Sequence, residues 1–416
     1  MTDPATVLSE LAEACEGLAR PADESDAVAG VAPSLVAAPR SADQVAEVLR
    51  VAARHGLTVV ARGAGSKLDW GVPPERVDLV VDTSGMTGVV EHASGDLVAV
   101  VRAGTPMADV QQTLADADQQ LALDDPTGAG TVGGTVATAV SGPRRLLYGT
   151  VRDLLIGITF VRADGVVAKA GGKVVKNVAG YDFAKLLAGS FGTLGVITQA
   201  AFRLHPLARD RRTVSVRAAG AAAATRMAQD VLGSQVVPSA VEIDAPPGGG
   251  RPEVAVLLEG VAEGVRARAA TAARLLGDAE QRPAMPGWWG RYPFAVGDTG
   301  LKLTTEIAGL PALLDAVRRA GDRTGLPVHV RGSAAGVLYA GIPSGGDPAG
   351  VATAVSVLRA NAATYGGTVV VLTAPPAVRA GVDVWGPVSG IDLMRRVKHE
   401  MDPRRTLAPG RFVGGI

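Results

Sequence analysis

The 416-residue sequence predicts an α+β fold divided between two domains. Hydrophobic residues make up 47% of the chain and charged residues 20%, a balance typical of a globular protein with a sizeable core. Glycine, with 53 residues, gathers in loops between short β-branched runs in the first half of the chain. After His205-Pro206 these loops become fewer, and strand patterns alternate with alanine-rich helical patterns. This change in sequence pattern predicts the boundary between the domains.

The first domain is expected to contain one well-marked helix and several strands. Ser41-Ala-Asp-Gln44 has the spacing of an N-terminal capping box and Gly56 stands where a helix would end, which predicts a helix over 41–55. A second helix is expected after Thr105-Pro106, and no regular periodicity is visible from Thr127 to Gly149. Short apolar runs predict strands at 57–61, 77–81, 89–92, 97–102, 156–161, 166–170 and 196–204.

The second domain repeats one order of elements, strand-helix-strand-strand-helix, twice. That order predicts a single antiparallel sheet covered by helices on one face. Helices are predicted at 221–232, 262–276, from Leu310, and at 348–365. Strands are predicted at 213–216, 240–244, 253–258, 302–307, 328–331, 336–341 and 368–373.

Charge and cysteine usage exclude several classes of function. Lys+Arg and Asp+Glu are both 41, so no basic excess is available to neutralise a nucleic-acid backbone. The single cysteine, Cys15, excludes an internal disulfide and a thiolate-ligated metal cluster, and it predicts a cytosolic chain. The acidic, helix-like N-terminus lacks the features of a signal peptide, and no stretch is long and apolar enough for a membrane span. Five scattered histidines form no metal-binding pair, so no metal is expected.

Three interpretations compete for the glycine loops. Gly63-Ala-Gly-Ser-Lys67 fails as a phosphate-binding P-loop because Ser66 precedes the lysine and Leu68 follows it. Gly128-Ala-Gly-Thr-Val-Gly133 has the spelling of a dinucleotide fingerprint, but Asp124-Asp-Pro126 occupies the place of the required strand. In the third interpretation, glycine turns about 65 residues apart present converging backbone N–H groups to one diphosphate. Ordinary tight turns are the structural alternative for any single loop.

A series of segments follows in a fixed order along the chain: Arg62-Gly-Ala-Gly-Ser-Lys67, Thr131-Val-Gly-Gly134, Gly142 to Arg145 with Tyr148-Gly149 and Arg152-Asp153, Gly171 to Asp182, Gly189 to Ile197, Val382 to Pro387, Leu393-Met394, Lys398, Met401-Asp-Pro403 and Pro409-Gly-Arg-Phe412. This series resembles the FAD-binding domain of the vanillyl-alcohol oxidase or p-cresol methylhydroxylase (PCMH) type. The resemblance is greatest to the family of FAD-binding E subunits of bacterial glycolate oxidase (glycolate dehydrogenase), which take part in glycolate catabolism, and it extends into the C-terminal segment.

The resemblance implies a domain plan and a set of residues around FAD. It implies an N-terminal helix (1–28), a PCMH-type FAD-binding domain of two α+β subdomains (29–207), an α+β cap domain (208–385) and a C-terminal segment (386–416) that packs back on the FAD domain. The implied FAD contacts are Arg62, Gly63, Ala64, Gly65, Ser66 and Lys67 in the first loop, Thr131, Gly133 and Gly134 in the second wall, Thr138, Gly142, Tyr148 and Gly149 toward the ribityl chain and flavin, and Gly195, Val196 and Ile197.

Some positions depart from the family pattern or remain open. Relatives with covalent flavin often use a histidine in or beside the first loop, whereas this loop has Ser66 and Lys67, which implies non-covalent FAD. Ala408 stands where many relatives have asparagine, so a flavin hydrogen bond from that side chain is not expected. Asn177 and Tyr181 fit a cofactor contact and a rigid connector equally well.

The chemistry of a 2-hydroxy-acid oxidation requires a base, a cation for the carboxylate and the flavin as hydride acceptor. No catalytic residue is identified, and the strand 328–331 is expected to place His329 and Arg331 on opposite faces. The resemblance implies a cytoplasmic flavoprotein subunit that passes electrons within a complex with a second flavoprotein subunit and an iron–sulfur subunit. Any attachment of this chain to the inner face of the membrane would occur through these partners. Two alternatives remain: a self-contained FAD-dependent oxidoreductase using Arg331, Arg411 or His329 on a small hydroxy acid, or a cofactor-bearing assembly module.

Overall fold

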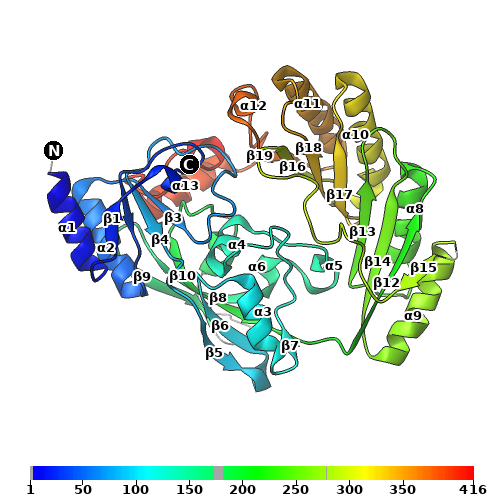
Figure 1. The fold of residues 1–416 in the computed structure, drawn as a ribbon, viewed down its shortest axis with the longest axis horizontal. Coiled ribbons are helices and arrows are strands. Elements are labelled where there is room, and N and C mark those ends of the chain that lie inside the picture. Colours follow the sequence, from blue (N-terminus) through cyan, green and yellow to red (C-terminus); the bar gives the residue numbers. More distant parts are fainter. Residues whose placement is uncertain (1–2, 173–180, 278) are drawn as a thin grey trace. The chain divides into compact units, whose positions relative to one another are not determined.

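The chain forms two compact units, seen in a computed structural model that describes residues 3–172, 181–277 and 279–416 (Figure 1). The first unit comprises the described residues of Met1–Ser141, Gly149–Leu207 and Val388–Ile416. The second comprises those of Gly142–Tyr148 and Ala208–Pro387. The short segment Gly142–Tyr148 therefore belongs to the second unit although it interrupts the first in sequence.

The first unit begins with a small mixed sheet beside two helices. Strands β2 and β3 run parallel to β4, and β1 runs antiparallel to β2. Helix α1 ends at Ala14, so the helix is shorter than the predicted span 1–28. The elements are α1 (Pro4–Ala14), β1 (Ala19–Pro21), η1 (Glu24–Asp26), β2 (Leu35–Ala37), α2 (Ala42–His55), β3 (Val59–Arg62) and β4 (Leu79–Asp82), with sheet order β1-β2-β4-β3.

Helix α2 shows how local sequence determines its own ends. The Ser41 hydroxyl accepts a hydrogen bond from the Gln44 amide at 3.1 Å, and Gly56 adopts the left-handed conformation at φ 65°. Between these ends, apolar positions at helical spacing bury Val45, Val48 and Leu49 against the sheet. The predicted helix over 41–55 is confirmed.

A second, antiparallel sheet in the first unit has the order β5-β6-β10-β8-β9. It packs through Val101, Phe160 and Phe202 into a core shared with the helices beside it. The elements are β5 (Val89–Ala93), η2 (Ser94–Asp96), β6 (Val98–Arg102), α3 (Met107–Ala115), α4 (Val132–Thr138), α6 (Val151–Leu154), β8 (Leu155–Val161), β9 (Val167–Gly171), α7 (Phe183–Leu187) and β10 (Val196–Arg203). The short strands β7 (Gln119–Gln120) and β11 (His205–Pro206) pair with each other.

The region from Thr127 to Gly149 holds two short helices, α4 and α5 (Arg145–Tyr148), where the sequence predicted no regular structure. Helices this short are marginal by propensity and depend on surrounding contacts. The Thr131 side chain caps α4 by accepting from the Gly134 amide at 3.4 Å. This cap is local, but helices of seven and four residues are too short to show a helical period in the sequence.

The second unit is built on one sheet with the order β15-β12-β14-β13-β17-β18-β16-β19, and every pairing in it is antiparallel, as predicted. Helices α8 to α11 lie along one face (Figure 1). The elements are β12 (Asp210–Arg217), α8 (Ala221–Leu232), β13 (Ala240–Ala245), β14 (Glu253–Gly260), α9 (Ala262–Leu275), β15 (Glu280–Arg282), β16 (Thr299–Thr304), η3 (Ile307–Gly309), α10 (Leu310–Thr324), β17 (His329–Ser333), β18 (Val337–Ile342), α11 (Pro348–Thr364), β19 (Val369–Thr373) and α12 (Pro376–Ala380).

The two faces of this sheet differ in chemistry because side chains alternate along each strand. One face is apolar, and residues such as Ile243, Val256 and Leu301 are completely buried on it. The other face carries polar side chains, including Glu242 on β13, Tyr339 on β18 and Lys302 on β16, the last two being cross-strand partners. The helices cover the apolar face, and on the polar face α5 and the Tyr292 ring pack against the sheet.

The C-terminal segment, with α13 (Ile391–Met401) and η4 (Val413–Gly415), belongs to the first unit. It extends the small sheet, because Val59 donates to the Thr406 carbonyl at 2.8 Å and accepts from the Ala408 amide at 2.8 Å. Residues far apart in the sequence thus meet beside β3. Among the helices that the structure describes, none has the length and apolar character needed to cross a membrane.

Candidate functional site

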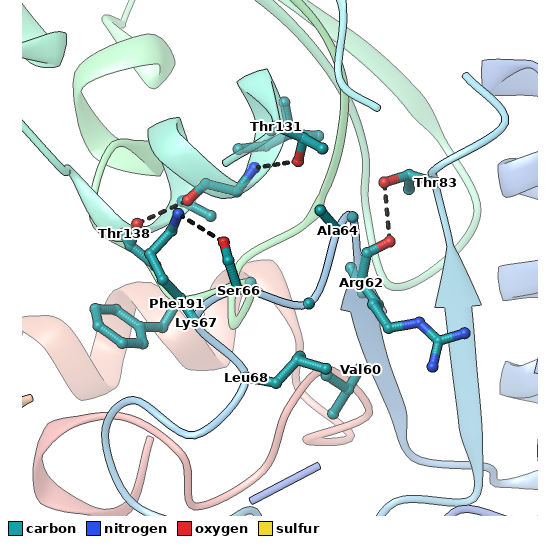
Figure 2. Close-up of a pocket in the computed structure, with 18 of the residues that line it drawn as sticks. Val60, Arg62, Ala64, Ser66, Lys67, Leu68, Thr83, Thr131, Thr138 and Phe191 are labelled. Atoms are coloured by element: carbon teal, nitrogen blue, oxygen red, sulfur yellow. Dashed lines mark hydrogen bonds between the residues drawn. The ribbon is translucent and has the colours of Figure 1, made fainter. Parts of the chain in front are cut away.

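A pocket in the first unit lies where β3 ends and is partly open to solvent (Figure 2). Three stretches form most of its wall: residues 60–68, residues 131–138 with gaps, and residues 191–197 with gaps. Thr83 and Arg411 complete it. The pocket therefore joins segments that are separated by up to 351 positions along the chain.

The first loop, Gly63 to Lys67, has backbone N–H groups that do not bond to the described part of the protein. Within the described part of the chain, none of the five backbone N–H groups from Gly63 to Lys67 donates to a protein acceptor. Backbone donors that are left without partners in a pocket are unusual and cost free energy unless water or a ligand accepts from them. Consecutive free N–H groups of this kind are suited to an anion.

The second wall, Thr131 to Gly134, is different because its backbone donors are already used. The amides of Val132 and Gly133 donate to the carbonyls of Thr105 and Ala103 at 2.9 and 2.7 Å. The Gly134 amide donates to the Thr131 hydroxyl. This wall therefore supplies a close, flat backbone surface and not a set of free donors.

Glycine is required where the two walls meet. A Cβ atom at Gly63 would lie 2.2 Å from the Thr131 hydroxyl oxygen, and one at Gly133 would lie 2.9 Å from the Ala103 Cβ. At Gly195, a Cβ would lie 2.7 Å from the Phe160 ring. Contacts shorter than 3.0 Å are not tolerated by real Cβ atoms. The two walls thus approach each other closely at Gly63, whereas Gly133 and Gly195 pack closely against Ala103 and Phe160.

Lys67 brings a positive charge to the pocket and is only 5% exposed. Its ammonium donates to the Ser66 hydroxyl at 3.2 Å (Figure 2). Burial lowers the pKa of Lys67, and the carboxylate of Asp125 opposes that shift. A buried ammonium with a single neutral acceptor is well placed to pair with an incoming anion.

Arg62 does not direct its charge into the pocket. Its guanidinium donates to Asp26 at 2.8 Å and to Asp82 at 2.7 Å, and these bonds hold the end of β3. Its carbonyl accepts from the Thr83 hydroxyl at 3.0 Å (Figure 2). Arg62 therefore shapes the pocket through its backbone, while its side chain stabilises the strand.

Arg411 holds the far side of the first loop. Its guanidinium is buried and donates to the carbonyls of Lys67 at 3.2 Å and Leu68 at 2.7 Å. The next residue, Phe412, stacks on Phe191 with ring centroids 5.5 Å apart. The C-terminal segment thus fixes the conformation of the pocket loop, and Arg411 is not positioned as a substrate-handling residue.

The structure brings twelve of the predicted site residues to this pocket: Arg62, Gly63, Ala64, Gly65, Ser66, Lys67, Thr131, Gly133, Gly134, Thr138, Gly195 and Ile197. Gly142, Tyr148, Gly149 and Val196 do not line it. Gly142 and Tyr148 belong to the second unit. Gly149 serves a local turn at φ 87°, and the Val196 side chain is buried in the core. Tyr181 is 87% exposed, and Asn177 lies outside the described residues.

Sequence reasoning missed several lining residues: Val60, Ala61, Leu68, Thr83, Ala137, Phe191, Gly192 and Arg411. Most of them flank a predicted segment, so extending each glycine loop into its neighbouring strand or helix would have found them. Thr83 directly follows the strand β4, which pairs with β3. No local signal marks Thr83 or Arg411 because their roles arise from long-range packing.

In the second unit, the expectation that His329 and Arg331 lie on opposite faces of a strand is wrong. Residues two positions apart on a strand point to the same face. Both side chains contact one carboxylate: the His329 Nε2 lies 2.9 Å from Asp244 Oδ1, and the Arg331 Nε donates to the same oxygen at 2.7 Å. The guanidinium carbon of Arg331 also lies 5.5 Å from the centroid of the Trp288 ring. Joint action of His329 and Arg331 is thus geometrically possible.

Comparison with known proteins also indicates a cofactor-binding domain in this part of the chain. Residues 33–171 match the family model described as an FAD binding domain. The chain is 32% identical over 217 residues to glycolate oxidase subunit GlcD of Bacillus subtilis, which covers 51% of this chain and 46% of that protein. It is 36% identical over 186 residues to a D-lactate dehydrogenase of Archaeoglobus fulgidus (44% and 41% covered), and 37% identical over 161 residues to glycolate oxidase subunit GlcE of Escherichia coli (38% and 45% covered). The matched stretches span less than half the length of each relative.

Two solved structures share the fold of the whole chain. A 4-ethylphenol oxidase from Gulosibacter chungangensis superposes with a TM-score of 0.74, and p-cresol methylhydroxylase superposes with a TM-score of 0.71. Each covers 98% of this chain and 96% of the other at 16% identity. The resemblance to the PCMH type, expected from the order of the sequence segments, is confirmed at the level of fold.

Proposed function

From the premise that residues 33–171 are an FAD-binding domain in a PCMH-type fold, we propose that the chain is a flavoprotein subunit of a 2-hydroxy-acid dehydrogenase of the glycolate oxidase kind. The observation that carries the proposal is the row of N–H groups from Gly63 to Lys67 that find no acceptor among the residues the structure describes, next to the buried Lys67 ammonium. The names of the GlcD and GlcE relatives support the glycolate assignment.

The residues of the pocket fit FAD. A cofactor with a diphosphate needs several donors and a positive charge at one place, which the first loop and Lys67 provide. It also needs a wall without side chains for close approach, and Gly63, Gly133 and Gly195 provide that wall because no Cβ fits at any of them. Bound FAD would supply the hydride acceptor that a hydroxy-acid oxidation requires.

The chain's own residues keep this site preorganised. Asp26 and Asp82 hold Arg62 at the end of β3, so the strand delivers the loop at a fixed position. Arg411 holds the opposite side of the loop by donating to the carbonyls of Lys67 and Leu68. An anion entering such a site meets donors that need no rearrangement.

We propose that FAD is bound without a covalent link. The described residues that line the pocket include no histidine, cysteine or tyrosine that could be joined to a flavin. Cys15 is buried in a separate core beside α1 and α2, where its thiol donates to the Leu11 carbonyl. This arrangement supports retention of FAD by hydrogen bonds, charge and packing.

We propose that a second flavoprotein subunit and an iron–sulfur subunit are its partners, and that the complex is cytoplasmic. The pairing of GlcD-like and GlcE-like relatives supports the first part, and the low cysteine content supports the second. A self-contained hydroxy-acid oxidoreductase is the second candidate. The observation favouring it is that His329 and Arg331 share Asp244, which places a base and a cation together.

Purification of the full chain, alone and co-expressed with candidate partner subunits, tests the proposal. We expect the chain alone to be yellow, to release FAD on denaturation, and to reduce a dye acceptor with glycolate or D-lactate only weakly until the partners are present. Robust turnover by the chain alone would contradict the subunit assignment and favour the second candidate. A colourless chain that FAD cannot reconstitute would contradict the flavoprotein assignment itself.

A further inference from the structure

Phe191 lines the pocket at the end of β3 and has a backbone conformation that its side chain disfavours (Figure 2). Its φ is 54°, in the left-handed region, although it carries a Cβ and a large ring. The flanking Gly189 and Gly192 share this region at φ 84° and 75°, which glycine adopts at little cost. A bulky residue held there is strained, and such strain persists only where surrounding contacts impose it. The contacts around Phe191 therefore determine the shape of this part of the pocket.

Two contacts hold Phe191 in this conformation. Its amide donates to the carbonyl of Ala137 in α4 at 2.8 Å, and Ala137 also lines the pocket. Its ring stacks on the ring of Phe412 in the C-terminal segment, with centroids 5.5 Å apart and 29° between the planes. Phe412 is not among the described residues that line the pocket. Phe412 therefore acts on the pocket through Phe191.

Arg411, the residue before Phe412, holds a different wall of the pocket. Its side chain is buried, and one terminal nitrogen of its guanidinium donates to the carbonyls of Lys67, Leu68 and Trp70 at 3.2, 2.7 and 3.5 Å. These carbonyls lie at the end of the loop 63–67, whose amides find no acceptor among the described residues. Arg411 therefore fixes one end of this row of free donors.

The backbone of residues 409–412 is bound to the stretch that follows the first loop. The Val72 amide donates to the Arg411 carbonyl at 3.3 Å, and the Glu75 amide donates to the Pro409 carbonyl at 2.8 Å. Because Arg411 and Phe412 are neighbours on one backbone, docking of this backbone brings both side chains to their walls together. Irregular segments held by a few hydrogen bonds open locally at a lower free energy than the core. Docking of the segment and the conformation of the pocket are therefore parts of one equilibrium.

We propose that Arg411 and Phe412 are positioning residues that couple docking of the C-terminal segment to ligand binding in the pocket. When residues 409–412 are docked, the first loop and Phe191 hold the arrangement that the ligand meets. When they are undocked, the strained conformation of Phe191 loses its aromatic support. Such coupling is reciprocal, so a ligand in the pocket stabilises the docked segment by the same factor. That the ligand is FAD rests on the proposed function, whereas the link between the segment and the pocket does not.

Titration of the full-length apoprotein with FAD tests the role of Phe412. Phe412→Leu keeps an apolar side chain but removes the stack, so we expect the dissociation constant for FAD to rise about tenfold. Phe202→Leu is the matched control, because Phe202 is buried in the core of the same unit and does not line the pocket. A loss of stability alone leaves the dissociation constant unchanged while the chain stays folded. An unchanged constant in Phe412→Leu, or an equal rise in Phe202→Leu, would overturn the inference.

The same titration separates a positioning role of Arg411 from a simple effect of its charge. Arg411→Lys keeps the charge but has a shorter side chain without the planar group, so the dissociation constant for FAD should again rise about tenfold. Arg404→Lys is the control in the same segment, since Arg404 is exposed and donates to the Ala53 carbonyl at 3.2 Å. It should keep wild-type affinity. Wild-type affinity in Arg411→Lys would show that a positive charge is sufficient and would overturn the positioning role.

Hydrogen exchange of the wild-type chain tests the reciprocal effect and depends on no variant. Saturating FAD should slow exchange of a peptide covering 408–416 about tenfold, although Arg411 is the one residue of this peptide that lines the pocket. Unchanged exchange of this peptide would contradict the coupling. If a variant does not fold, this measurement still decides.

Exchange in the apoprotein separates this inference from the proposed function. Without FAD, Phe412→Leu should speed exchange of a peptide covering 188–193 about tenfold more than Phe202→Leu does, because Phe191 loses its stacking partner. A chain that shows this effect but cannot bind FAD would overturn the flavoprotein assignment and leave the link between the segment and the pocket intact. A chain that binds FAD without slower exchange of 408–416 would overturn the inference and leave the flavoprotein assignment intact.

Discussion

Lys67 is the residue whose charge the pocket uses most directly. A buried ammonium with one neutral acceptor gains a strong partner when an anion binds, so Lys67→Met should weaken FAD binding about 10- to 100-fold. Equilibrium dialysis or fluorescence titration of the apoprotein with FAD measures the change. Burial lowers the pKa of Lys67 in the free protein and a bound anion would raise it, so FAD affinity should fall as pH rises through that lowered value.

Lys169→Met is the matched control because Lys169 is exposed on β9 and does not line the pocket. It should retain wild-type FAD affinity. If Lys67→Met also retains that affinity, the ammonium does not contact the cofactor, and only the backbone donors of the loop would remain as the anion site.

Gly63 tests the close approach of the two walls. A Cβ at this position would lie 2.2 Å from the Thr131 hydroxyl oxygen, so Gly63→Ala should push the walls apart and cost about 1–3 kcal/mol of stability as well as FAD retention. Removing that oxygen in the double variant Gly63→Ala with Thr131→Ala should restore part of both, as a double-mutant cycle would show. Urea unfolding and flavin content measure the two effects.

Gly220→Ala is the control for this pair, since nothing lies within 4 Å of a Cβ there and its φ of 175° suits any residue. A yellow, stable Gly63→Ala variant would show that the walls can separate without loss of the site.

At the residue scale, sequence patterns located the parts of the pocket whose residues lie close together in the sequence. The spacing of glycines around Gly63 and Gly133 predicted both walls because steric exclusion there is local to each loop. Arg411 was one of three residues named for substrate in the self-contained alternative, and it holds a loop more than 340 positions away, a contact that only the folded chain reveals. Tyr148 was assigned to FAD although its hydroxyl lies 3.4 Å from Glu259 in the second unit.

Helix α13 depends on a buried ion pair that joins the C-terminal segment to the first unit. The Lys398 ammonium donates to Asp402 at 2.7 Å and to the carbonyls of Thr193 and Leu407 at 2.8 and 2.9 Å. Lys398→Met would leave a buried carboxylate and two carbonyls without this donor, so it should reduce the free energy of unfolding by about 3–5 kcal/mol. Urea unfolding of the apoprotein measures the loss.

Lys185→Met removes an exposed pair with Asp182 and provides the comparison. It should change the free energy of unfolding by less than about 1 kcal/mol. Equal losses in the two variants would mean that the C-terminal segment contributes little to the stability of the unit.

The end of β3 is stabilised by a second buried acid, Asp26, which binds Arg20 and Arg62. The hydrogen bond from Arg20, supported by the bond from Arg62, holds the pKa of Asp26 well below its usual range despite burial. A lowered folded-state pKa means that the stabilisation is complete above the unfolded value near pH 3.9 and is lost as pH falls below it. Asp26→Asn should therefore cost about 3 kcal/mol at neutral pH, and the difference from wild type should shrink in acid.

Unfolding by urea across about pH 2 to 7 tests this dependence, with Asp322→Asn as a control that removes only an exposed pair with Arg318. The control should stay within about 0.5 kcal/mol of wild type at every pH. A pH-independent cost of Asp26→Asn would attribute the loss to packing and not to charge.

At the element scale, elements with strong local signals were predictable and those held by tertiary contacts were not. Helix α2 has its serine cap and its terminal glycine, and α8 was predicted with its observed bounds because its apolar period is clear. Helices α4 and α5 were not predicted because they have seven and four residues and little intrinsic helicity. The strand β17 was predicted, but the expected placement of His329 and Arg331 on opposite faces was wrong, because residues two positions apart on a strand point to the same face.

At the scale of the whole molecule, the sequence pattern changes after His205-Pro206, and the second unit resumes at Ala208. The chain returns to the first unit at Val388, and the C-terminal segment was expected from residue 386. The segment Gly142–Tyr148 could not be assigned from sequence because its membership depends on contacts with strands such as β13, about 100 positions later. Division into units is therefore encoded partly locally and partly by long-range packing.

The confinement of the pocket to the first unit leads to a prediction for hydrogen exchange. The N–H groups from Gly63 to Lys67 have no protein acceptor in the described part of the chain, so their exchange in the apoprotein should be fast. FAD at about 100 times its dissociation constant stabilises the bound state by about 2.7 kcal/mol, which should slow exchange of peptides covering 59–68 and 131–138 by tenfold or more. Peptides within α8 and α10 should change much less, because neither helix lines the pocket.

Riboflavin, which has the flavin ring but no diphosphate, separates the role of the first loop from that of the rest of the pocket. Because free N–H groups and Lys67 are suited to an anion, we expect riboflavin to leave the exchange of 59–68 unchanged even where it slows exchange elsewhere. Equal protection of this loop by riboflavin and FAD would show that the ring, and not the diphosphate, occupies the site beside Gly63. In that case Lys67 would pair with an anion other than the diphosphate, and FAD would lie in the pocket in the opposite orientation.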